Sequence, residues 1–500
     1  MERHELAEKP SNPKLKKIQQ PVRQAKWARV ARRLQRRLDP VLAPLYEVSS
    51  HARDTAVHAY WDWRKTTNRL PFDRAAGFSV GPTPKGGERP KNVVWVMLDA
   101  LRQDIFEEYL RRGGLADLVD EGVYFSRAFA QGSWTYPSVF SFLTGRYPFN
   151  CGVSRLTDTD GVPGSVCADF DDTCPTIFRL LRDHDYRVGS ILDGWGFTVR
   201  TTAGLEHRED RYFEENWGWI CGQSRRYLSL DELREASLAY IESAGRQSPF
   251  VLFVRSLYTH SPYRGIFKSA EYVTNLSRER SVVRLMEGFI RGLRRFEGDY
   301  LRPMLEVLEQ AGKRDDTIIV INSDHGDMFW NVEDDLRTGD LDEEMWRHQL
   351  EPYNALIKVP LLITGARMKG VYSQRFRLID VVPTLLEELG IEYEPAQFDG
   401  VSVRRVEARP LYADSAGVGF GGVAFQAGGP KLLMSHRLGT VSYPITEDQY
   451  ERLNLRRDAG IYVNEFTEFL EQASRSRHVE ADQDDAEVLL RRLQMLGYIE

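Results

Sequence analysis

Residues 92–99 have the sequence Asn-Val-Val-Trp-Val-Met-Leu-Asp, a run of apolar side chains that ends in a carboxylate. A short apolar run bounded by polar residues is typical of a strand that is buried on both faces of a parallel sheet. Residues 249–254 and 317–322 have the same character. Polar residues follow all three runs, namely Asp99, His260 and the pair Asp324-His325. Because ligands gather at the carboxyl ends of strands in open α/β sheets, Asp99 is either a site carboxylate or a cap for the next helix.

Strand-like and helix-like segments alternate over most of the chain. We expect strands near 92–98, 123–125, 186–192, 249–254 and 317–322 and within 356–363, with helices near 105–112, 174–182, 230–243, 277–312 and 380–389. Ser229 and Glu232 have the spacing of a capping box at the start of one helix. This alternation predicts the α/β fold class, with a mostly parallel sheet sandwiched by helices.

Composition changes along the chain predict three regions. Residues 1–88 form a basic helical N-terminal extension that ends in a Gly/Pro/Lys-rich linker, and residues 89–404 form the α/β catalytic domain. Residues 405–500 contain short strand-like pieces, many glycines and terminal helices near 465–475 and 484–496. They predict a small C-terminal α+β subdomain.

Residues 14–45 of the extension carry an apolar stripe opposite a basic face. The apolar residues recur at steps of three or four, as in an amphipathic helix: Trp27, Val30, Leu34, Leu38, Val41 and Leu45. One interpretation is peripheral docking on an anionic membrane surface or an acidic partner. The other is a helix that packs on its own catalytic domain and exposes its basic face to solvent.

The overall composition indicates which partners and which cellular compartment to expect. The net charge of −6 over 500 residues argues against nucleic acid as a partner. No apolar leader segment follows the first residues, so we expect a cytoplasmic protein, with membrane association at the inner face if the basic helix docks there. The four cysteines lack paired Cys-x-x-Cys spacing, which argues against a zinc cage. In a reducing compartment we expect reduced, partly buried thiols, a Cys167–Cys174 bridge being the alternative. Nothing in the sequence indicates the oligomeric state.

Residues 132–148, Gly-Ser-Trp-Thr-Tyr-Pro-Ser-Val-Phe-Ser-Phe-Leu-Thr-Gly-Arg-Tyr-Pro, are expected to run from a loop into a helix. Pro137 suits the first helical turn, and Gly145 ends the helix. Thr135 then lies at the positive end of the helix dipole, near free backbone N–H groups. That position suits the binding of a tetrahedral anion, although Thr135 could instead be only a helix cap.

The ends of several predicted strands therefore carry residue types that together can bind a metal ion. The carboxylates of Asp99 and Asp324, the imidazole of His325 and the hydroxyl of Thr135 make a site for one divalent ion, which could be Mn, Zn, Mg or Ca. Such an ion would lower the pKa of the Thr135 hydroxyl and orient it as a nucleophile. His260 and His348 could contact the transferred group or assist the leaving group. Each residue taken alone could also be a turn, a cap or a packed histidine.

These residues carry a resemblance to a known family. The chain resembles a sulfatase-type member of the alkaline phosphatase superfamily through six segments in the same order, namely 92–104, 133–148, 249–263, 315–327, 348–363 and 380–391. The resemblance covers about 89–402. It implies that Asp99, Asp324 and His325 are metal ligands, that Thr135 is the nucleophile and a further ligand, and that His260 and His348 are substrate-side residues.

Departures from the family pattern refine this expectation. Sulfatases proper need a cysteine or serine that matures to formylglycine and an arginine four residues later, where this chain has Thr135 and Val139. A threonine nucleophile resembles the phosphoester-handling branches of the superfamily. Ala100 replaces a second acidic ligand of many sulfatases, and Cys151 and Tyr258 replace other polar family residues. The replacement of that acidic ligand by Ala100 favours one transition-type ion over calcium.

The sequence thus predicts a metal-dependent hydrolase or group transferase that acts on a phosphate or sulfate ester through Thr135. The substrate would be a small molecule, a glycan or a lipid headgroup. One rival is a true sulfatase in which threonine does the work of formylglycine. Another is a catalytically silent relative that binds an anionic glycan or lipid headgroup.

Overall fold

The computed structural model describes residues 77–84, 91–151, 157–158, 166–167, 174–193, 219–221, 228–244, 249–260, 282–327, 352–405, 407, 409–415, 422–435, 439–443, 464–470 and 472. The chain divides into two units, Met1–Asn68 and Arg69–Glu500, and every described residue belongs to the second. Among the described residues, no helix has the length and apolar character that crossing a membrane requires.

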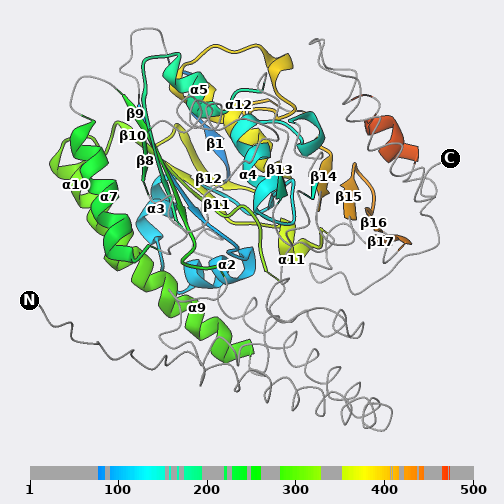
Figure 1. The fold of residues 1–500 in the computed structure, drawn as a ribbon, viewed down its shortest axis with the longest axis horizontal. Helices are drawn as coiled ribbons and strands as arrows, with labels where there is room; N and C mark the ends of the chain where they lie inside the picture. Colours follow the sequence, from blue (N-terminus) through cyan, green and yellow to red (C-terminus); the bar gives the residue numbers. More distant parts are fainter. Residues whose placement is uncertain are drawn as a thin grey trace, which may run out of the picture. The chain divides into compact units, whose positions relative to one another are not determined.

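The described residues contain a mixed sheet of nine strands in the order β1-β12-β3-β11-β10-β2-β9-β7-β8 (Figure 1). Neighbours from β10 to β8 pair in parallel, whereas β11 and β1 run antiparallel to their neighbours. The strands are β1 Ser79–Val80, β2 Asn92–Leu98, β3 Val123–Phe125, β7 Arg187–Leu192, β8 Trp219–Cys221, β9 Phe250–Ser256, β10 Thr317–Asn322, β11 Leu361–Thr364 and β12 Met368–Tyr372. The predicted mostly parallel sheet is confirmed.

The apolar runs form the centre of this sheet. Every residue of β2, β9 and β10 is buried. Because side chains alternate along a strand, Val93, Trp95 and Met97 share one face and pack in one core with α4 (Thr135–Thr144), α5 (Ile177–Arg182) and α12 (Val381–Leu389). The Trp95 ring stacks on Phe142 with centroids 5.3 Å apart. The same indole donates a hydrogen bond of 2.8 Å from Nε1 to Asn322 Oδ1 on the neighbouring β10.

A second group of helices covers the opposite face of the sheet (Figure 1). It comprises α2 Gln103–Arg111, α3 Ala116–Glu121, α7 Leu230–Ser243, α9 Val282–Phe296 and α10 Arg302–Gln310. Helix α7 contacts β7 and β9, while α3 contacts β3, β11 and β12. The capping box predicted at Ser229 and Glu232 is present at the start of α7. The sandwich of helices around the sheet is therefore as predicted.

Two predicted segments differ from the structure. From residue 282 onward, the helix predicted at 277–312 is interrupted by a π-helical turn, η5 Glu297–Leu301, before α10 begins. Pro303 follows this turn and has no N–H to continue the regular ladder, so the helix adjusts there. The strand predicted within 356–363 is present, but it is confined to the end of that range, because Leu356 and Ile357 belong to a helical turn, α11 Asn354–Ile357. Strand β11 begins only after Pro360, which cannot donate to a ladder.

The remaining short elements are small two-stranded pairs and 3₁₀ turns. They are β4 Ala128–Phe129 with β13 Phe376–Arg377, β5 Thr157–Asp158 with β6 Val166–Cys167, η3 Pro148–Asn150, η7 Leu378–Asp380 and η8 Pro395–Gln397. Cys151 and Cys174 are buried and form no disulfide, which contradicts the alternative of a Cys167–Cys174 bridge.

The C-terminal part contains an antiparallel sheet of four described strands, β14 Leu411–Asp414, β15 Gly422–Gln426, β16 Lys431–Ser435 and β17 Gly439–Tyr443. One face packs with a helix at 464–470 and with Tyr147 and Phe149. The other face packs with Phe129, Leu356 and Ile357. The predicted α+β subdomain is therefore present and shares its core with the α/β region.

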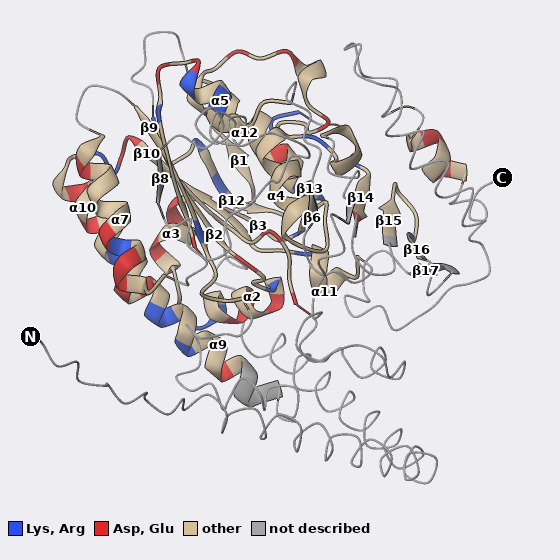
Figure 2. Ribbon diagram, viewed as in Figure 1, with Lys and Arg blue, Asp and Glu red and all other residues tan. Residues whose placement is uncertain are grey.

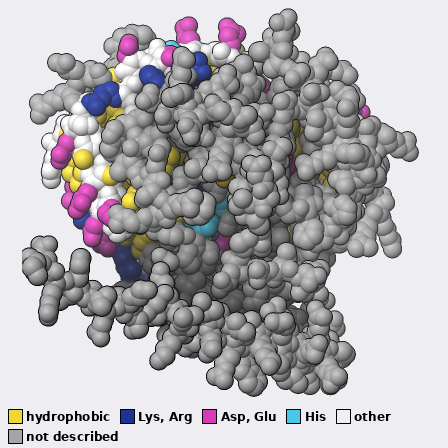
Figure 3. All heavy atoms as spheres, in the orientation of Figure 1, with side chains coloured by type: hydrophobic (Ala, Val, Ile, Leu, Met, Phe, Trp, Pro, Cys, Tyr) yellow, Lys and Arg dark blue, Asp and Glu magenta, His cyan; other side chains and the backbone are white. Residues whose placement is uncertain are grey.

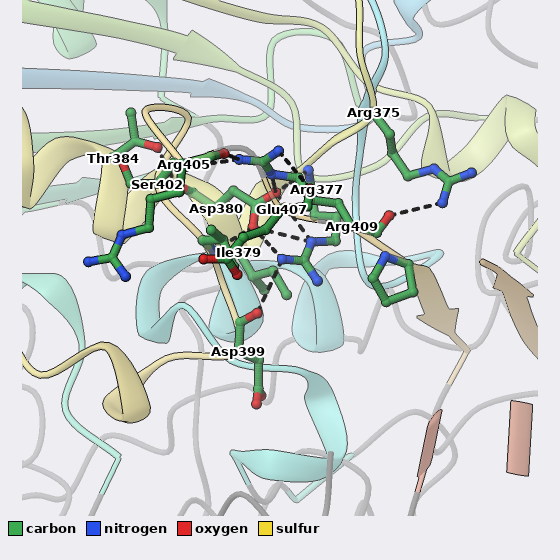
Figure 4. A network of polar contacts seen from close by, with 12 residues as sticks. Arg375, Arg377, Ile379, Asp380, Thr384, Asp399, Ser402, Arg405, Glu407 and Arg409 are labelled. Atoms are coloured by element: carbon green, nitrogen blue, oxygen red, sulfur yellow. Dashed lines mark hydrogen bonds and ion pairs between the residues drawn. The ribbon is translucent and has the colours of Figure 1, made fainter. Parts of the chain in front are cut away.

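Polar contacts reinforce this junction (Figure 4). Arg377 forms a buried fork on Asp380, with Nη2 at 2.6 Å from Oδ1. Arg375 Nη1 donates to the backbone carbonyls of Gln426 at 2.7 Å and Ala427 at 2.8 Å. These contacts fix the hairpin of the C-terminal sheet to the segment that precedes α12.

Charged side chains are interleaved over the described helices. Figure 2 shows both Asp/Glu and Lys/Arg residues on α7, α9 and α10. The described left-hand edge of the face in Figure 3 likewise mixes the two signs. This part of the surface does not present a basic stripe of the kind that tracks a nucleic-acid backbone.

Several predictions concern residues outside the described part of the chain. These are the amphipathic helix at 14–45, His348 and the terminal helix at 484–496. The region boundaries at 88/89 and 404/405, the cytoplasmic location and the membrane contact stay predictions.

Candidate active site

The sheet order explains how residues far apart in sequence meet. Strands β10, β2 and β9 are parallel neighbours, so their carboxyl ends lie at the same edge. Asp99 follows β2, Asp324 and His325 follow β10, and His260 lies beyond β9. Ligand atoms of Asp99, Asp324 and His325 all lie within 4.8 Å of one another, and all three residues are buried. The structure therefore brings together the predicted carboxylates and imidazole.

Thr135 joins this group from the other side. It is the first residue of α4, while Trp134 occupies the N-cap position, so Thr135 is not the helix cap. Its Oγ1 lies 3.2 Å from His325 Nε2. In the next turn, Ser138 Oγ donates a hydrogen bond of 2.5 Å to the carbonyl oxygen of Asp324. This bond fixes the start of α4 against the loop after β10. We call Asp99, Thr135, Asp324 and His325 the ligand cluster.

The orientation of His325 suits a metal ligand. Its Nδ1 lies 2.7 Å from the carbonyl oxygen of Gly326. Because a carbonyl only accepts, Nδ1 carries the hydrogen, and the neutral ring then presents the lone pair of Nε2 to the cluster. Histidine ligands in metal sites are commonly oriented by such a bond from the second ring nitrogen.

The carboxylate of Asp324 also fits a bound cation. Its Oδ1 accepts hydrogen bonds from the backbone N–H groups of His325 at 3.0 Å and Ala100 at 3.3 Å. Its Oδ2 is buried and accepts no hydrogen bond from any residue that the structure describes. Two carboxylates, a neutral imidazole and a hydroxyl form a donor set that suits a divalent ion.

The charges in the cluster point the same way. Burial, and then the charge of Asp99, raise the pKa of Asp324 above its ordinary value. Two buried carboxylates at this distance disfavour each other's ionised form. A cation held between them reverses this effect, because it stabilises both negative charges. The charges of the cluster therefore suit a bound divalent cation.

Arg255 was not predicted from the sequence, yet it contacts the cluster directly. It lies on β9 and is 6% exposed, and its Nη2 and Nε donate to Asp99 Oδ2 at 2.7 and 3.1 Å. Burial alone would lower the pKa of Arg255, but the charges of Asp99 and Asp324 raise it, so the guanidinium stays charged. One signal could have identified it. A charged residue continues the apolar run 249–254 near the end of a strand that is otherwise buried.

Asp99 is held by its backbone as well as by its side chain. Its carbonyl oxygen accepts a hydrogen bond of 2.7 Å from Thr259 Oγ1, and its N–H donates to Ser256 at 3.0 Å. The next residue, Ala100, has φ of +61°, a left-handed conformation that costs a non-glycine residue free energy. This turn aims the Ala100 N–H at Asp324. Helix α2 begins at Gln103 with Arg102 at its N-cap, so Asp99 is not a helix cap.

The structure describes only one of the two histidines that were predicted to be substrate-side residues. His260 Nε2 lies 4.0 Å from Asp99 Oδ1, so this ring borders the ligand cluster. His348 lies outside the described residues, and its role stays a prediction.

Comparisons with known proteins identify the family to which this chain belongs. The family model described as Sulfatase matches residues 91–391. The chain is 25% identical to the low-salt glycan biosynthesis sulfotransferase Agl7 of Haloferax volcanii over 63% of its length. It is 23% identical to the human N-acetylglucosamine-6-sulfatase, also over 63% of its length. It spans 64% of the length of each of these curated relatives.

Solved structures share the fold at low sequence identity. A 2-O glycosaminoglycan sulfatase matches with a TM-score of 0.54 and 14% identity, covering 80% of this chain and 96% of the other. A protein in the alkaline phosphatase superfamily from Vibrio parahaemolyticus matches with a TM-score of 0.52 and 15% identity, covering 84% and 91%. The family match covers more than half of the chain and includes Asp99, Thr135, Asp324 and His325, and the chain therefore belongs to the sulfatase family.

Proposed function

We propose that this protein is a metal-dependent enzyme that transfers or hydrolyses a phosphate or sulfate ester through Thr135 as the nucleophile. The observation that carries the proposal is the position of the Thr135 hydroxyl. It lies 3.2 Å from His325 Nε2, within the cluster that Asp99 and Asp324 complete. A hydroxyl beside two carboxylates and an imidazole at the end of a parallel sheet matches what ester chemistry requires.

Each residue has a defined task in this proposal. Asp99, Asp324 and His325 would hold one divalent ion. Such an ion supplies positive charge that lowers the pKa of a nearby hydroxyl and offsets charge on a transferred group. Thr135 gives up its hydroxyl proton to solvent, and its Oγ1 attacks the sulfur or phosphorus atom in line with the leaving ester oxygen. The bond to that oxygen breaks, and the group is left on Thr135.

The N-terminus of α4 contributes to the same step. Thr135 is the first helical residue, so backbone N–H groups of the first turn lack partners within the helix, and we propose that they bind oxygens of the transferred group. His260, which borders Asp99, would contact an oxygen of that group or protonate the leaving oxygen, and we propose the same for His348.

Thr135 also separates this protein from enzymes that use formylglycine. Threonine cannot be converted to that aldehyde, so the group must pass through an ordinary alcohol ester. Release from Thr135 then needs an acceptor, which is water in a hydrolase and a substrate hydroxyl in a transferase. The similarity to a protein named a glycan biosynthesis sulfotransferase favours transfer as the second candidate and a glycan as the substrate class.

The test is turnover of aryl phosphate monoesters, aryl phosphate diesters and an aryl sulfate, without metal and with Mn²⁺, Zn²⁺, Mg²⁺ or Ca²⁺. We expect metal-dependent turnover that Thr135→Ala abolishes and Thr135→Ser retains in part. Thr144→Ala is a matched control on the same helix, because the Thr144 hydroxyl bonds only to the carbonyls of Phe140 and Ser141 among the described residues. Its turnover should equal that of the wild type.

Mass spectrometry adds a second readout. After a rapid quench, the peptide that contains Thr135 should gain the mass of the transferred group in the wild type and not in Thr135→Ala. Full turnover in Thr135→Ala would refute the proposed nucleophile. Metal and sulfated-glycan binding without turnover on any ester would support the silent binding protein instead.

A further inference from the structure

Arg255 and the carboxylate that it contacts are both buried at the end of the sheet. Its guanidinium spans two neighbouring strand ends, because Nη2 and Nε grip Asp99 Oδ2 while Nη1 donates to the carbonyl oxygen of Asp193 at 3.2 Å. The strand register places Arg255 opposite Met97 on β2 and opposite Leu192 on β7. Arg255 therefore joins three adjacent strands where the ligand cluster lies.

A second carboxylate secures the other end of this contact. Asp193 Oδ2 accepts a hydrogen bond of 2.9 Å from the N–H of Leu257, and Oδ1 accepts one of 2.7 Å from Leu228. The side chain of Asp193 thus fixes the end of β9, and its backbone carbonyl fixes Arg255. The guanidinium is held from both sides, so its position on Asp99 is well determined.

This contact uses only one oxygen of Asp99. Oδ2 is taken by the guanidinium, whereas Oδ1 faces the cluster, at 3.5 Å from His325 Nε2 and 4.0 Å from His260 Nε2. Both guanidinium N–H groups converge on Oδ2 and fix the position of that oxygen, and the rigid carboxylate then restricts where Oδ1 can lie. The oxygen available to a metal ion is then determined before any ion binds.

Charge leads to the same conclusion. The two carboxylates of the cluster carry two negative charges. The positive charge of Arg255, which is a permanent part of the protein, offsets one of them. A second divalent ion could reach Asp99 Oδ2 only by displacing a buried guanidinium. We infer that Arg255 is a positioning residue, a built-in cation that orients Asp99 as a metal ligand and limits the site to one ion. This inference rests on the proposed metal-dependent function.

The experiment is calorimetric titration of the full-length metal-free protein with Mn²⁺ and with Zn²⁺, supported by elemental analysis of the dialysed sample. The variants are Arg255→Met, which removes the charge, and Arg255→Lys, which keeps a charge but cannot form the fork. Arg377→Lys is the matched control, because Arg377 forms a similar buried fork on Asp380, away from the ligand cluster. Thermal unfolding of each metal-free variant reports stability separately.

We expect one ion per wild-type chain. Partners that orient a metal ligand typically change affinity by about 10- to 100-fold, so the Kd should rise by about that factor in Arg255→Met and by about 10-fold in Arg255→Lys. Arg377→Lys should lower thermal stability and leave the Kd unchanged. If Arg255→Met does not fold, Arg255→Lys alone decides.

Three results would overturn the inference. An unchanged Kd in both Arg255 variants would show that Arg255 acts only in folding. A tighter Kd in Arg255→Met would show that its charge merely repels the ion. Two ions per wild-type chain would refute the limit to one. If the wild type binds no ion, the proposed function on which the inference depends is refuted instead. The wild-type titration shows this outcome before any variant is made.

Discussion

Replacing Gly326 with alanine should disturb the ligand cluster by an amount that the structure allows us to calculate. A Cβ atom at Gly326 would lie 2.0 Å from the carbonyl oxygen of Ala355, where contacts below about 3.0 Å are not tolerated. The obstacle is backbone, which cannot rotate away, so one of the two segments must move by about 1 Å. Gly326 also donates its N–H to Leu356 at 2.6 Å, and its carbonyl orients the ring of His325.

A displacement of about 1 Å at a reacting centre can reduce the rate about 100-fold, which corresponds to about 2.7 kcal/mol of activation free energy. Crowding of this kind also costs about 1–3 kcal/mol of stability. The assay is kcat/KM on the best aryl ester at saturating metal, together with urea unfolding of the same sample. We expect Gly326→Ala to lose about 100-fold in kcat/KM while remaining folded.

Gly298→Ala is the matched control, because a Cβ there meets no atom within 4 Å. It should keep full activity and gain up to about 1 kcal/mol of stability, as glycine in a helical segment does when replaced by alanine. If kcat/KM of Gly326→Ala stays within threefold of the wild type, the loop after β10 tolerates the predicted displacement. Activity then does not depend on the exact position of His325.

Three further predictions follow. Asp324→Asn removes a charged ligand and should weaken Mn²⁺ binding in calorimetry by more than about 100-fold, beyond the effect of a merely orienting residue; equal affinity would refute its role. Phe142→Ala should lower the free energy of unfolding by about 3–5 kcal/mol in urea, because the buried ring stacks on Trp95. Burial raises the pKa of Tyr147 to about 12. Between pH 10 and 12 the hydroxyl therefore stays protonated in the folded protein but ionises in the unfolded chain. The free energy of unfolding should fall as the pH rises through this range. Tyr147→Phe loses the hydrogen bond of 2.6 Å from Arg377, and its deficit of about 1.5–3 kcal/mol at pH 9 should narrow at pH 11, as urea unfolding at both pH values would show.

The central fold could be predicted from the sequence because its strands are simple apolar runs. Asn92–Leu98 and Thr317–Asn322 are buried on both faces, so nothing interrupts their apolar pattern. Strand β12 was not predicted, since Lys369 and Gly370 lie near the edge of the sheet and break that pattern. The π-helical turn also escaped prediction, because it depends on how the helix meets Pro303 rather than on periodicity.

The ligand cluster could be predicted in part because its residues follow strand ends. Asp99 comes directly after the last apolar residue of its strand, and Asp324 follows shortly after the last apolar residue of its strand. Both positions can be recognised from the local sequence. Arg255 could not be assigned in the same way, because its role depends on the order of strands in space. No pattern along the chain shows that β9 lies beside β2, and only that neighbourhood places a guanidinium on Asp99.

The segment just before Thr135 depends on parts of the chain that are made much later. The side chain of Gln131 accepts a hydrogen bond from Ile379, which lies 248 residues further along, and Ser133 bonds to Asp414 on the C-terminal sheet. On a ribosome, this segment is synthesised early but must wait for these distant partners to emerge. Contacts between such remote segments also slow folding. If Thr135 is the nucleophile, as we propose, a growing chain completes the contacts that hold this segment only after Asp414 has been synthesised, so the reaction has to wait until most of the chain exists.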